Sequence, residues 1–224
     1  MKHKTITIGL LVSACFLQSC GSKNSDTTKN EMDHAMPDMA KSDSMNSDAI
    51  SMDHGMMQGM SSTMGKMKDM KMTGDFDADF ASMMIMHHQA AIEMSEVEVD
   101  KGTDAQIKTI AQTIITAQKA EVAQLETFVK NYKKPETKVE NVGMGNLSKS
   151  MQDMMDKMHN LQMTGNTDKD FVVTMIAHHE SAVAMAEDEL KYGKQSVLKT
   201  MAQKIISDQS KEITDFKAWL VNQK

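Results

Sequence analysis

The sequence predicts an all-α protein, an antiparallel four-helix bundle built from two repeated helical hairpins. Three observations predict it: a long internal repeat, apolar residues recurring with a 3.6-residue period, and no alternating pattern typical of a strand. Residues 79–94 read DFASMMIMHHQAAIEM, and residues 170–185 read DFVVTMIAHHESAVAM. The offset between the copies is constant at 91 positions, from Asp79 to Asp170. We also expect a short methionine-rich helix before each hairpin and a disordered N-terminal tail.

The first long helix of each half is expected to begin at an acidic residue and to end near a glycine. Asp77 and Asp168 would place negative charge in the first helical turn, which the helix dipole favours. Gly102 and Gly193 stand near the expected ends, where we predict left-handed caps.

A second long helix follows in each half, over residues 104–132 and 195–222. Both carry an amphipathic stripe with a helical period. The stripe of the first copy is Ile107, Ile110, Ile114, Gln118, Val122, Leu125 and Phe128, and that of the second is Leu198, Met201, Ile205, Gln209, Ile213, Phe216 and Trp219.

Methionines at helical spacing predict the two short helices, each stopped by a Thr-Gly pair. These methionines are Met60, Met64 and Met67 in the first copy and Met151, Met155 and Met158 in the second. They are either ordinary core residues or, with His159, accessory metal ligands. The repeats would span residues 60–133 and 151–224 within one domain, 59–224, with the linker marked by Pro135 and residues 143–145.

The N-terminus is typical of a lipoprotein signal peptide, residues 1–19. Lys2 and Lys4 precede a short apolar run over residues 6–17, and Leu17-Gln18-Ser19-Cys20 resembles a lipobox. We expect lipidation of Cys20 and a membrane-anchored protein of the cell envelope that faces the periplasm or the exterior. The alternative is an ordinary cleaved signal with an incidental cysteine. Cys15 would be removed, leaving no disulfide.

Residues 20–58 are rich in Ser, Asp, Lys, Asn and Met, a composition that predicts a disordered tether. Two Met-Asp-His-x-Met elements lie in it, formed by Met32, His34 and Met36 and by Met52, His54 and Met56. They indicate metal capture; the alternative is a low-complexity linker.

Charge and composition exclude some partners. The net charge is -6 and all 25 basic side chains are lysines, so nucleic-acid and phosphate recognition are disfavoured. Methionine is abundant, with 26 residues against 6 Phe, 2 Tyr and 1 Trp, which raises the question of a soft metal.

The histidine pairs are placed by helix geometry. Phe80, Met84, His87, Ala91 and Met94 step by four, three, four and three, which puts His87 on the inward face and His88 at its flank. His178 and His179 repeat this arrangement.

Counting along each hairpin places other residues level with these. Gln118 and Gln209 should lie level with the inward histidines and orient their imidazoles through hydrogen bonds. Glu121 and Glu212 should lie one turn further, level with Met84 and Met175.

Thioether sulfur suits Cu(I) or Ag(I), and imidazole suits copper among several metals. A Met/His set without cysteine therefore indicates copper, Cu(I) first, with Ag(I) or Cu(II) as alternatives. The candidate ligands are Met84, His87, His88, Met94, Met175, His178, His179 and Met185.

The doubled pattern D-F-x-x-x-M-I-x-H-H-x-x-A-x-x-M resembles the secreted bacterial family catalogued as domain of unknown function 305. The resemblance covers residues 60–224. It implies a ferritin-like helical bundle that binds copper through methionine and histidine, as in periplasmic copper-resistance proteins.

The function expected from these observations is non-enzymatic. We expect an envelope protein that sequesters or delivers copper for resistance or homeostasis, with metal ions, the membrane and other copper-handling proteins as partners. One alternative is a structural or interaction bundle. Another is a di-iron carboxylate oxidase, but its Glu-x-x-His motif occurs only from Glu31 to His34, in the tail.

Overall fold

A computed structural model of the chain describes residues 65–66, 69–134 and 143–223. The chain divides into two units, Met1–Ser42 and Asp43–Lys224, and every described residue belongs to the second. The predicted signal peptide, Cys20, both Met-Asp-His elements, Pro135, and Met60, Met64 and Met67 of the first methionine run lie outside the described residues.

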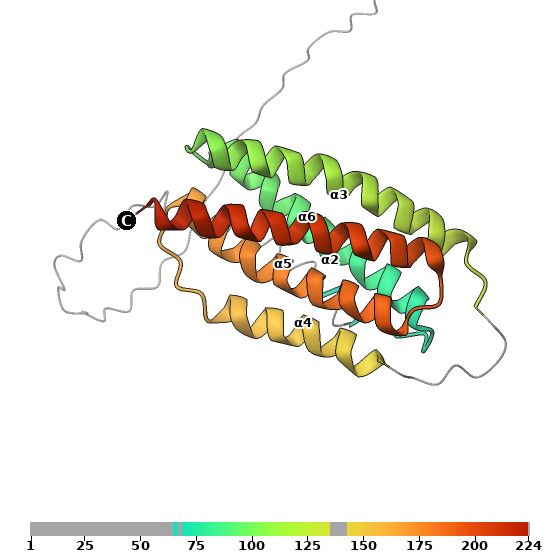
Figure 1. The fold of residues 1–224 in the computed structure, drawn as a ribbon. Coiled ribbons are helices and arrows are strands. Elements are labelled where there is room, and N and C mark those ends of the chain that lie inside the picture. Colours follow the sequence, from blue (N-terminus) through green and yellow to red (C-terminus); the bar gives the residue numbers. More distant parts are fainter. Residues whose placement is uncertain (1–64, 67–68, 135–142, 224) are drawn as a thin grey trace, which may run out of the picture. The chain divides into compact units, whose positions relative to one another are not determined.

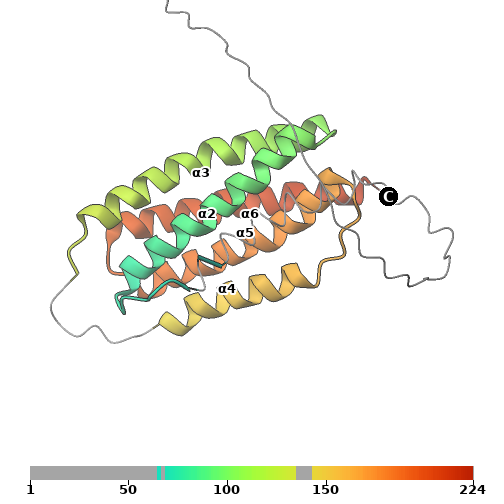
Figure 2. The ribbon, with the colours of Figure 1, turned by 180° about the vertical axis from the view of Figure 1, so that it is seen from behind.

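The described part is helical, and no strand occurs in it. Helices α2 and α3 form one hairpin, α5 and α6 form the other, and α2 packs against α5 (Figures 1 and 2). A shorter helix, α4, packs along α5. The predicted fold class, a ferritin-like bundle of two repeated hairpins, is confirmed. The helices are α2 (Phe76–Lys101), α3 (Ala105–Asn131), α4 (Met144–His159), α5 (Thr167–Tyr192) and α6 (Ser196–Val221).

A repeated aspartate fixes the turn before each inner helix. Asp79 accepts hydrogen bonds from the backbone N–H groups of Thr73 and Gly74, at 2.7 and 2.9 Å. Asp170 does the same for Thr164 and Gly165, at 2.8 and 2.9 Å. Both glycines have positive φ, 78° and 79°, a conformation that glycine adopts without steric cost. The aspartate of the repeated motif therefore has a structural task.

Gly102 and Gly193 correct the prediction of left-handed caps. Their φ values are -62° and -64°, with ψ at 155°, so both are extended. Glycine is needed for another reason: a Cβ atom would lie 2.0 Å from Oε1 of Glu98 or Glu189. Each glutamate folds back over the glycine and is buried.

Two aspartates join the hairpins reciprocally. Asp77, in the first turn of α2, accepts backbone hydrogen bonds from Lys194 and Gln195 at the start of α6, at 2.9 and 2.8 Å. Asp168, in the first turn of α5, accepts from the backbone N–H groups of Thr103 and Asp104 before α3, at 2.9 and 2.8 Å. The start of each inner helix thus meets the end of the other, so α2 and α5 run antiparallel.

The stripes predicted for the outer helices face the core. On α3, Ile107, Ile114, Gln118 and Leu125 are buried, and Ile110, Val122 and Phe128 are half-buried. On α6, all members are buried except half-buried Ile213. Trp219 Nε1 donates to Asp104 Oδ2 at 3.0 Å, which ties the end of α6 to the start of α3.

Helix α4 confirms the second predicted methionine helix, with a different buried face. Leu147, Met151, Met154 and Met158 belong to the hydrophobic core, whereas Met155 is half-buried and His159 is exposed. The spacing of four, three and four selects Met154 in place of Met155.

Within the described residues, no helix combines the length and the apolar character needed to cross a membrane.

Candidate metal centre

The two inward histidines meet at the centre of the bundle. His87 of α2 and His178 of α5 have ring centroids 3.7 Å apart, with the rings tilted by 43°. Both side chains are fully buried, and none of their four ring nitrogens has a hydrogen-bond partner. Buried polar atoms in proteins are nearly always paired, so four unpartnered nitrogens at one point call for a ligand.

Burial keeps these imidazoles neutral. Loss of hydration lowers the pKa of His87 and of His178 well below the ordinary value, and the neighbouring histidines lower it further. A neutral imidazole keeps a lone pair on one ring nitrogen, which a metal ion requires.

All four predicted methionine ligands are fully buried in the same core. Met84 and Met175 lie one helical turn from His87 and His178, about 4.5 Å along the axis. Met94 and Met185 lie seven residues from those histidines, about 10 Å along the axis. Counted along the helix axis, Met84 and Met175 are therefore nearer to the histidine pair than Met94 and Met185.

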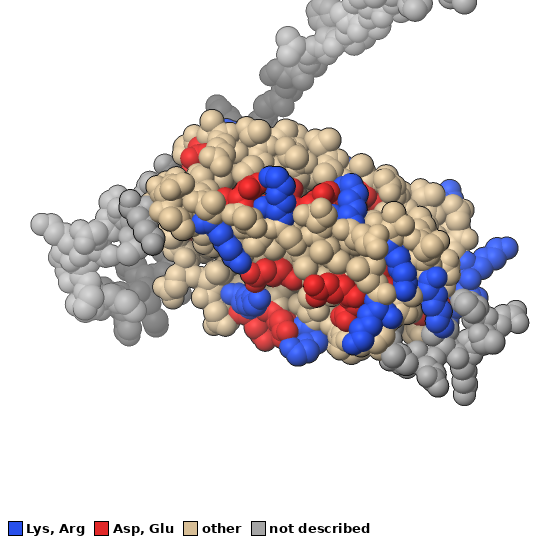
Figure 3. Space-filling view, viewed as in Figure 1, with Lys and Arg blue, Asp and Glu red and all other residues tan. Residues whose placement is uncertain are grey.

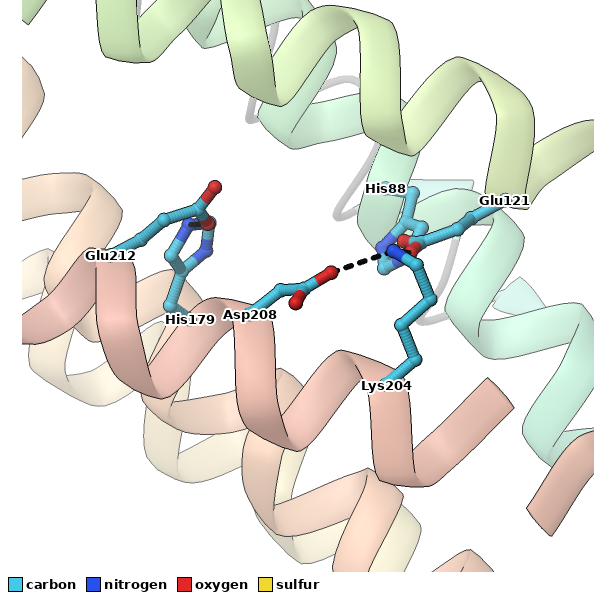
Figure 4. A network of polar contacts seen from close by, with 6 residues as sticks. All are labelled: His88, Glu121, His179, Lys204, Asp208 and Glu212. Atoms are coloured by element: carbon cyan, nitrogen blue, oxygen red, sulfur yellow. Dashed lines mark hydrogen bonds and ion pairs between the residues drawn. The ribbon is translucent and has the colours of Figure 1, made fainter. Parts of the chain in front are cut away.

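The flanking histidines are held by glutamates of the outer helices (Figure 4). His88 Nε2 lies 2.9 Å from Glu121 Oε2, and His179 Nε2 lies 2.8 Å from Glu212 Oε2. The first contact is a hydrogen bond, while the second is an ion-pair contact without hydrogen-bond alignment. Both histidines are fully buried, and Nδ1 of each has no partner. A carboxylate that fixes one ring nitrogen leaves the other free for a metal.

These contacts correct the position expected for Glu121 and Glu212. Both were expected beside Met84 and Met175, but their carboxylates lie beside His88 and His179. Side chains on a helix lean toward its N-terminus. In an antiparallel hairpin this lean moves the histidine head away from the connecting loop and the glutamate head toward it. Counting Cα positions ignored this offset, so sequence reasoning missed the carboxylate–histidine pairs.

The glutamate of the first repeat has an additional partner. Lys204 Nζ lies 2.9 Å from Glu121 Oε1 and 2.6 Å from Asp208 Oδ2. Burial by itself would raise the pKa of Glu121, but the hydrogen bonds from His88 and Lys204 outweigh it and lower the pKa. The lowered pKa keeps Glu121 ionised, so its carboxylate is the acceptor in both contacts.

Gln118 and Gln209 are buried, each only 3 % exposed, as expected for members of the amphipathic stripes. They make no hydrogen bond to His87 or His178, whose ring nitrogens are unpartnered. The Oε1 atom of each glutamine is also buried without a partner. The orienting role therefore has no contact to support it in this structure.

Soft, neutral donors make up the centre. Among the described residues, no group of three or more His, Cys, Asp or Glu side chains is arranged to hold a metal ion. The two inward imidazoles lie together, and each has a methionine one helical turn before it in the sequence. Thioether and imidazole are ligand types that suit Cu(I) or Ag(I).

Comparison with known families identifies the chain. The family model described as Domain of unknown function (DUF305) matches residues 12–127 and 77–220. The chain belongs to the DUF305 family. Two overlapping matches agree with the two repeats of this DUF305 protein. No curated protein sequence matches it significantly.

Solved structures of similar proteins include metal-bound ones. CopM in its Cu(II)-bound form is 30 % identical, with a TM-score of 0.51, over 66 % of this DUF305 chain and 97 % of CopM. The Cu(I)-bound form is 29 % identical, with a TM-score of 0.50, over 66 % and 96 %. A DUF305 protein from Streptomyces coelicolor is 25 % identical, with a TM-score of 0.54, over 67 % of this chain and 95 % of that protein.

Proposed function

We propose that this DUF305 protein binds Cu(I), and Ag(I) in its place, at a centre formed by His87 and His178 with Met84 and Met175. The observation that carries the proposal is the set of four buried ring nitrogens without partners at the point where the repeats meet. Each repeat supplies half of the donors, so the ion would join the two hairpins.

The relatives support copper handling as the function. CopM has been solved with Ag, Cu(I) and Cu(II) bound. This chain resembles it over most of CopM's length, and its own donors are of the type that such ions prefer. We therefore propose sequestration or delivery of copper for metal resistance or homeostasis, without an enzymatic step.

Other predicted ligands, on the inner helices and in the tail, would act around this centre. His88 and His179, each fixed by a glutamate, would offer Nδ1 to the ion. Met94 and Met185 would serve a second position further along the core. The Met-Asp-His elements of residues 20–58 would capture the ion first, and a lipid on Cys20 would hold the protein at the cell envelope.

The test is a Cu(I) titration against a competing chelator under reducing conditions. We compare the unmodified protein with a His87→Leu/His178→Leu double variant, since leucine fills the buried space without leaving polar atoms unpaired. Removing a residue that only orients a metal ligand lowers the affinity by up to about 100-fold. Because this variant removes two ligands themselves, we expect the affinity of the tightest site to fall by more than that.

Matched controls separate folding from binding. His159→Leu removes an exposed histidine and should leave the affinity unchanged. Circular dichroism reports whether the double variant keeps its helices. Equal affinity in both variants would place the tightest site away from His87 and His178, and no binding by the unmodified protein would favour the structural or interaction bundle.

A further inference from the structure

A groove of about 350 Å³ runs between the outer helices α3 and α6. Four carboxylates line it, Glu121, Asp208, Glu212 and Asp215. Lys211 pairs with Asp215, and Lys204 pairs with Glu121 and Asp208, so two lysines face four carboxylates and the groove stays net negative. Figure 3 shows acidic side chains interspersed with lysines on the face where α3 and α6 lie. A negatively lined hollow concentrates cations.

Two amide oxygens at the base of the groove have no partner. Gln118 and Gln209 line it from opposite helices, each 97 % buried, and the Oε1 atom of each accepts no hydrogen bond. An amide carbonyl oxygen is a neutral ligand for cations, and it holds a soft ion more weakly than a thioether or an imidazole does. Acidic walls and two unsatisfied carbonyls therefore describe a place suited to a small cation.

Two residues of the groove lining contact the histidines that flank the metal centre. They are Glu121 and Glu212, which contact His88 and His179 on the inner helices. His88 adjoins His87 in the sequence, and His179 adjoins His178. The four histidines are fully buried, so an ion needs a route to them from the surface.

We propose that the α3–α6 groove is the route by which a monovalent soft metal ion reaches the buried histidines, with the Gln118 and Gln209 carbonyl oxygens as transient ligands. This inference rests on the proposed function, because it concerns passage to that same centre. The groove need not hold the ion at equilibrium.

The route is asymmetric between the repeats. Lys204 forms ion pairs with Glu121 and with Asp208, and the Glu121 side chain is only 8 % exposed. The repeat mate of Lys204 is Thr113, which also lines the groove, so Glu212 has no lysine in the matching place and its side chain is 18 % exposed. The ion therefore meets the Glu212–His179 pair before the shielded Glu121–His88 pair.

The difference between the repeats suggests a variant that tests whether the ion enters on the Glu212 side of the groove. Thr113→Lys copies the lysine of the second repeat into the first and places an ammonium group at the open half of the groove. Thr116→Lys is the matched control: the same substitution and charge change on an exposed threonine of α3 outside the groove. Both threonine hydroxyls bond only to the backbone carbonyl four residues earlier.

The measurement is stopped-flow mixing of the protein with Ag⁺ as the aquo ion at low ionic strength, followed by ultraviolet difference absorbance. The phase due to the buried centre is the one lost in His87→Leu/His178→Leu. Thr113→Lys should slow that phase about fivefold, while Thr116→Lys should change its rate by less than about 1.5-fold. The reciprocal change Lys204→Thr should accelerate it.

The outcomes are distinguishable. If the unmodified protein shows no phase that depends on His87 and His178, the proposed function fails. If that phase is present and the two lysine variants alter its rate equally, the ion takes another route and the groove proposal is overturned.

Discussion

At Gly102 and Gly193, a glutamate carboxyl occupies the space that a Cβ atom would need, 2.0 Å from Glu98 or Glu189 Oε1. The backbone there is extended, with φ near -60°, so any residue could adopt it. The requirement for glycine is therefore one of space. A methyl group would push the buried carboxyl away from Asp168 or Asp77.

Gly102→Ala should consequently destabilise the protein by about 1–3 kcal/mol, the usual cost of overpacking. Gly145→Ala is the control, because that glycine lies in α4 and a methyl group added to it would meet no atom within 4 Å. There the substitution should stabilise by about 0.5–1 kcal/mol through helix propensity. Urea unfolding measures both, and destabilisation of similar size by the two changes would contradict the packing account.

Among the elements, α4 is the one whose methionines had two interpretations, core packing or metal binding. Its buried face carries Leu147 beside Met151, Met154 and Met158, and its one histidine, His159, is exposed. Ser181 Oγ donates to Ser150 O at 3.1 Å, which fixes the helix against α5. These contacts favour packing.

Met151→Leu/Met158→Leu should therefore leave the number of bound Cu(I) ions unchanged, because leucine keeps the apolar volume and removes only the thioether. Stability should change by less than about 1.5 kcal/mol. The comparison variant is Met84→Leu/Met175→Leu, which should weaken binding at the centre. A smaller number of bound ions in the α4 variant would restore the accessory-ligand interpretation.

At the scale of the whole bundle, a buried glutamate of one hairpin lies beside an aspartate of the other at each end of the inner helices. The pairs are Glu98 with Asp168 and Glu189 with Asp77. Burial raises the pKa of Glu98 to about 8, helped by the neighbouring Asp168, and that of Glu189 to about 9, helped by Asp77. As carboxylates, both glutamates would be buried without a hydrogen bond, since none of the four oxygens has a partner. With a proton, each can donate to its aspartate.

Stability should therefore fall as the pH rises from about 5 to 9. The folded protein keeps these protons up to a pKa of about 8 or 9, whereas the unfolded chain loses them near the ordinary value of 4.5. Unfolding between these limits releases protons, so a higher pH favours it.

Thermal unfolding across that range measures the effect. Glu98→Gln/Glu189→Gln should flatten the pH dependence, because glutamine donates without ionising. Glu96→Gln, at an exposed position of α2, should keep the slope of the unmodified protein. An unchanged slope in the double variant would refute the assignment.

Sequence reasoning reached the fold and the histidines through the internal repeat and the helical period, which can both be read along the chain without knowing how the helices pack. It placed His87 and His178 inward but did not show that they meet, because that depends on how α2 crosses α5. It missed the Glu121–His88 and Glu212–His179 contacts, which depend on the lean of side chains. At Gly102, the sequence predicted the end of the helix correctly but gave the wrong reason for the glycine. The space that a Cβ atom would need is filled by a glutamate one turn earlier in the helix.

The reciprocal bonds of Asp77 and Asp168 make each hairpin the complement of the other. Two separate copies of a single hairpin could satisfy the same contacts as a homodimer, with His87 facing its own counterpart across a two-fold axis. Joining the hairpins in one chain makes that association intramolecular and independent of protein concentration. It also frees the two halves to diverge, and the lysine at position 204 opposite the threonine at position 113 is one such divergence.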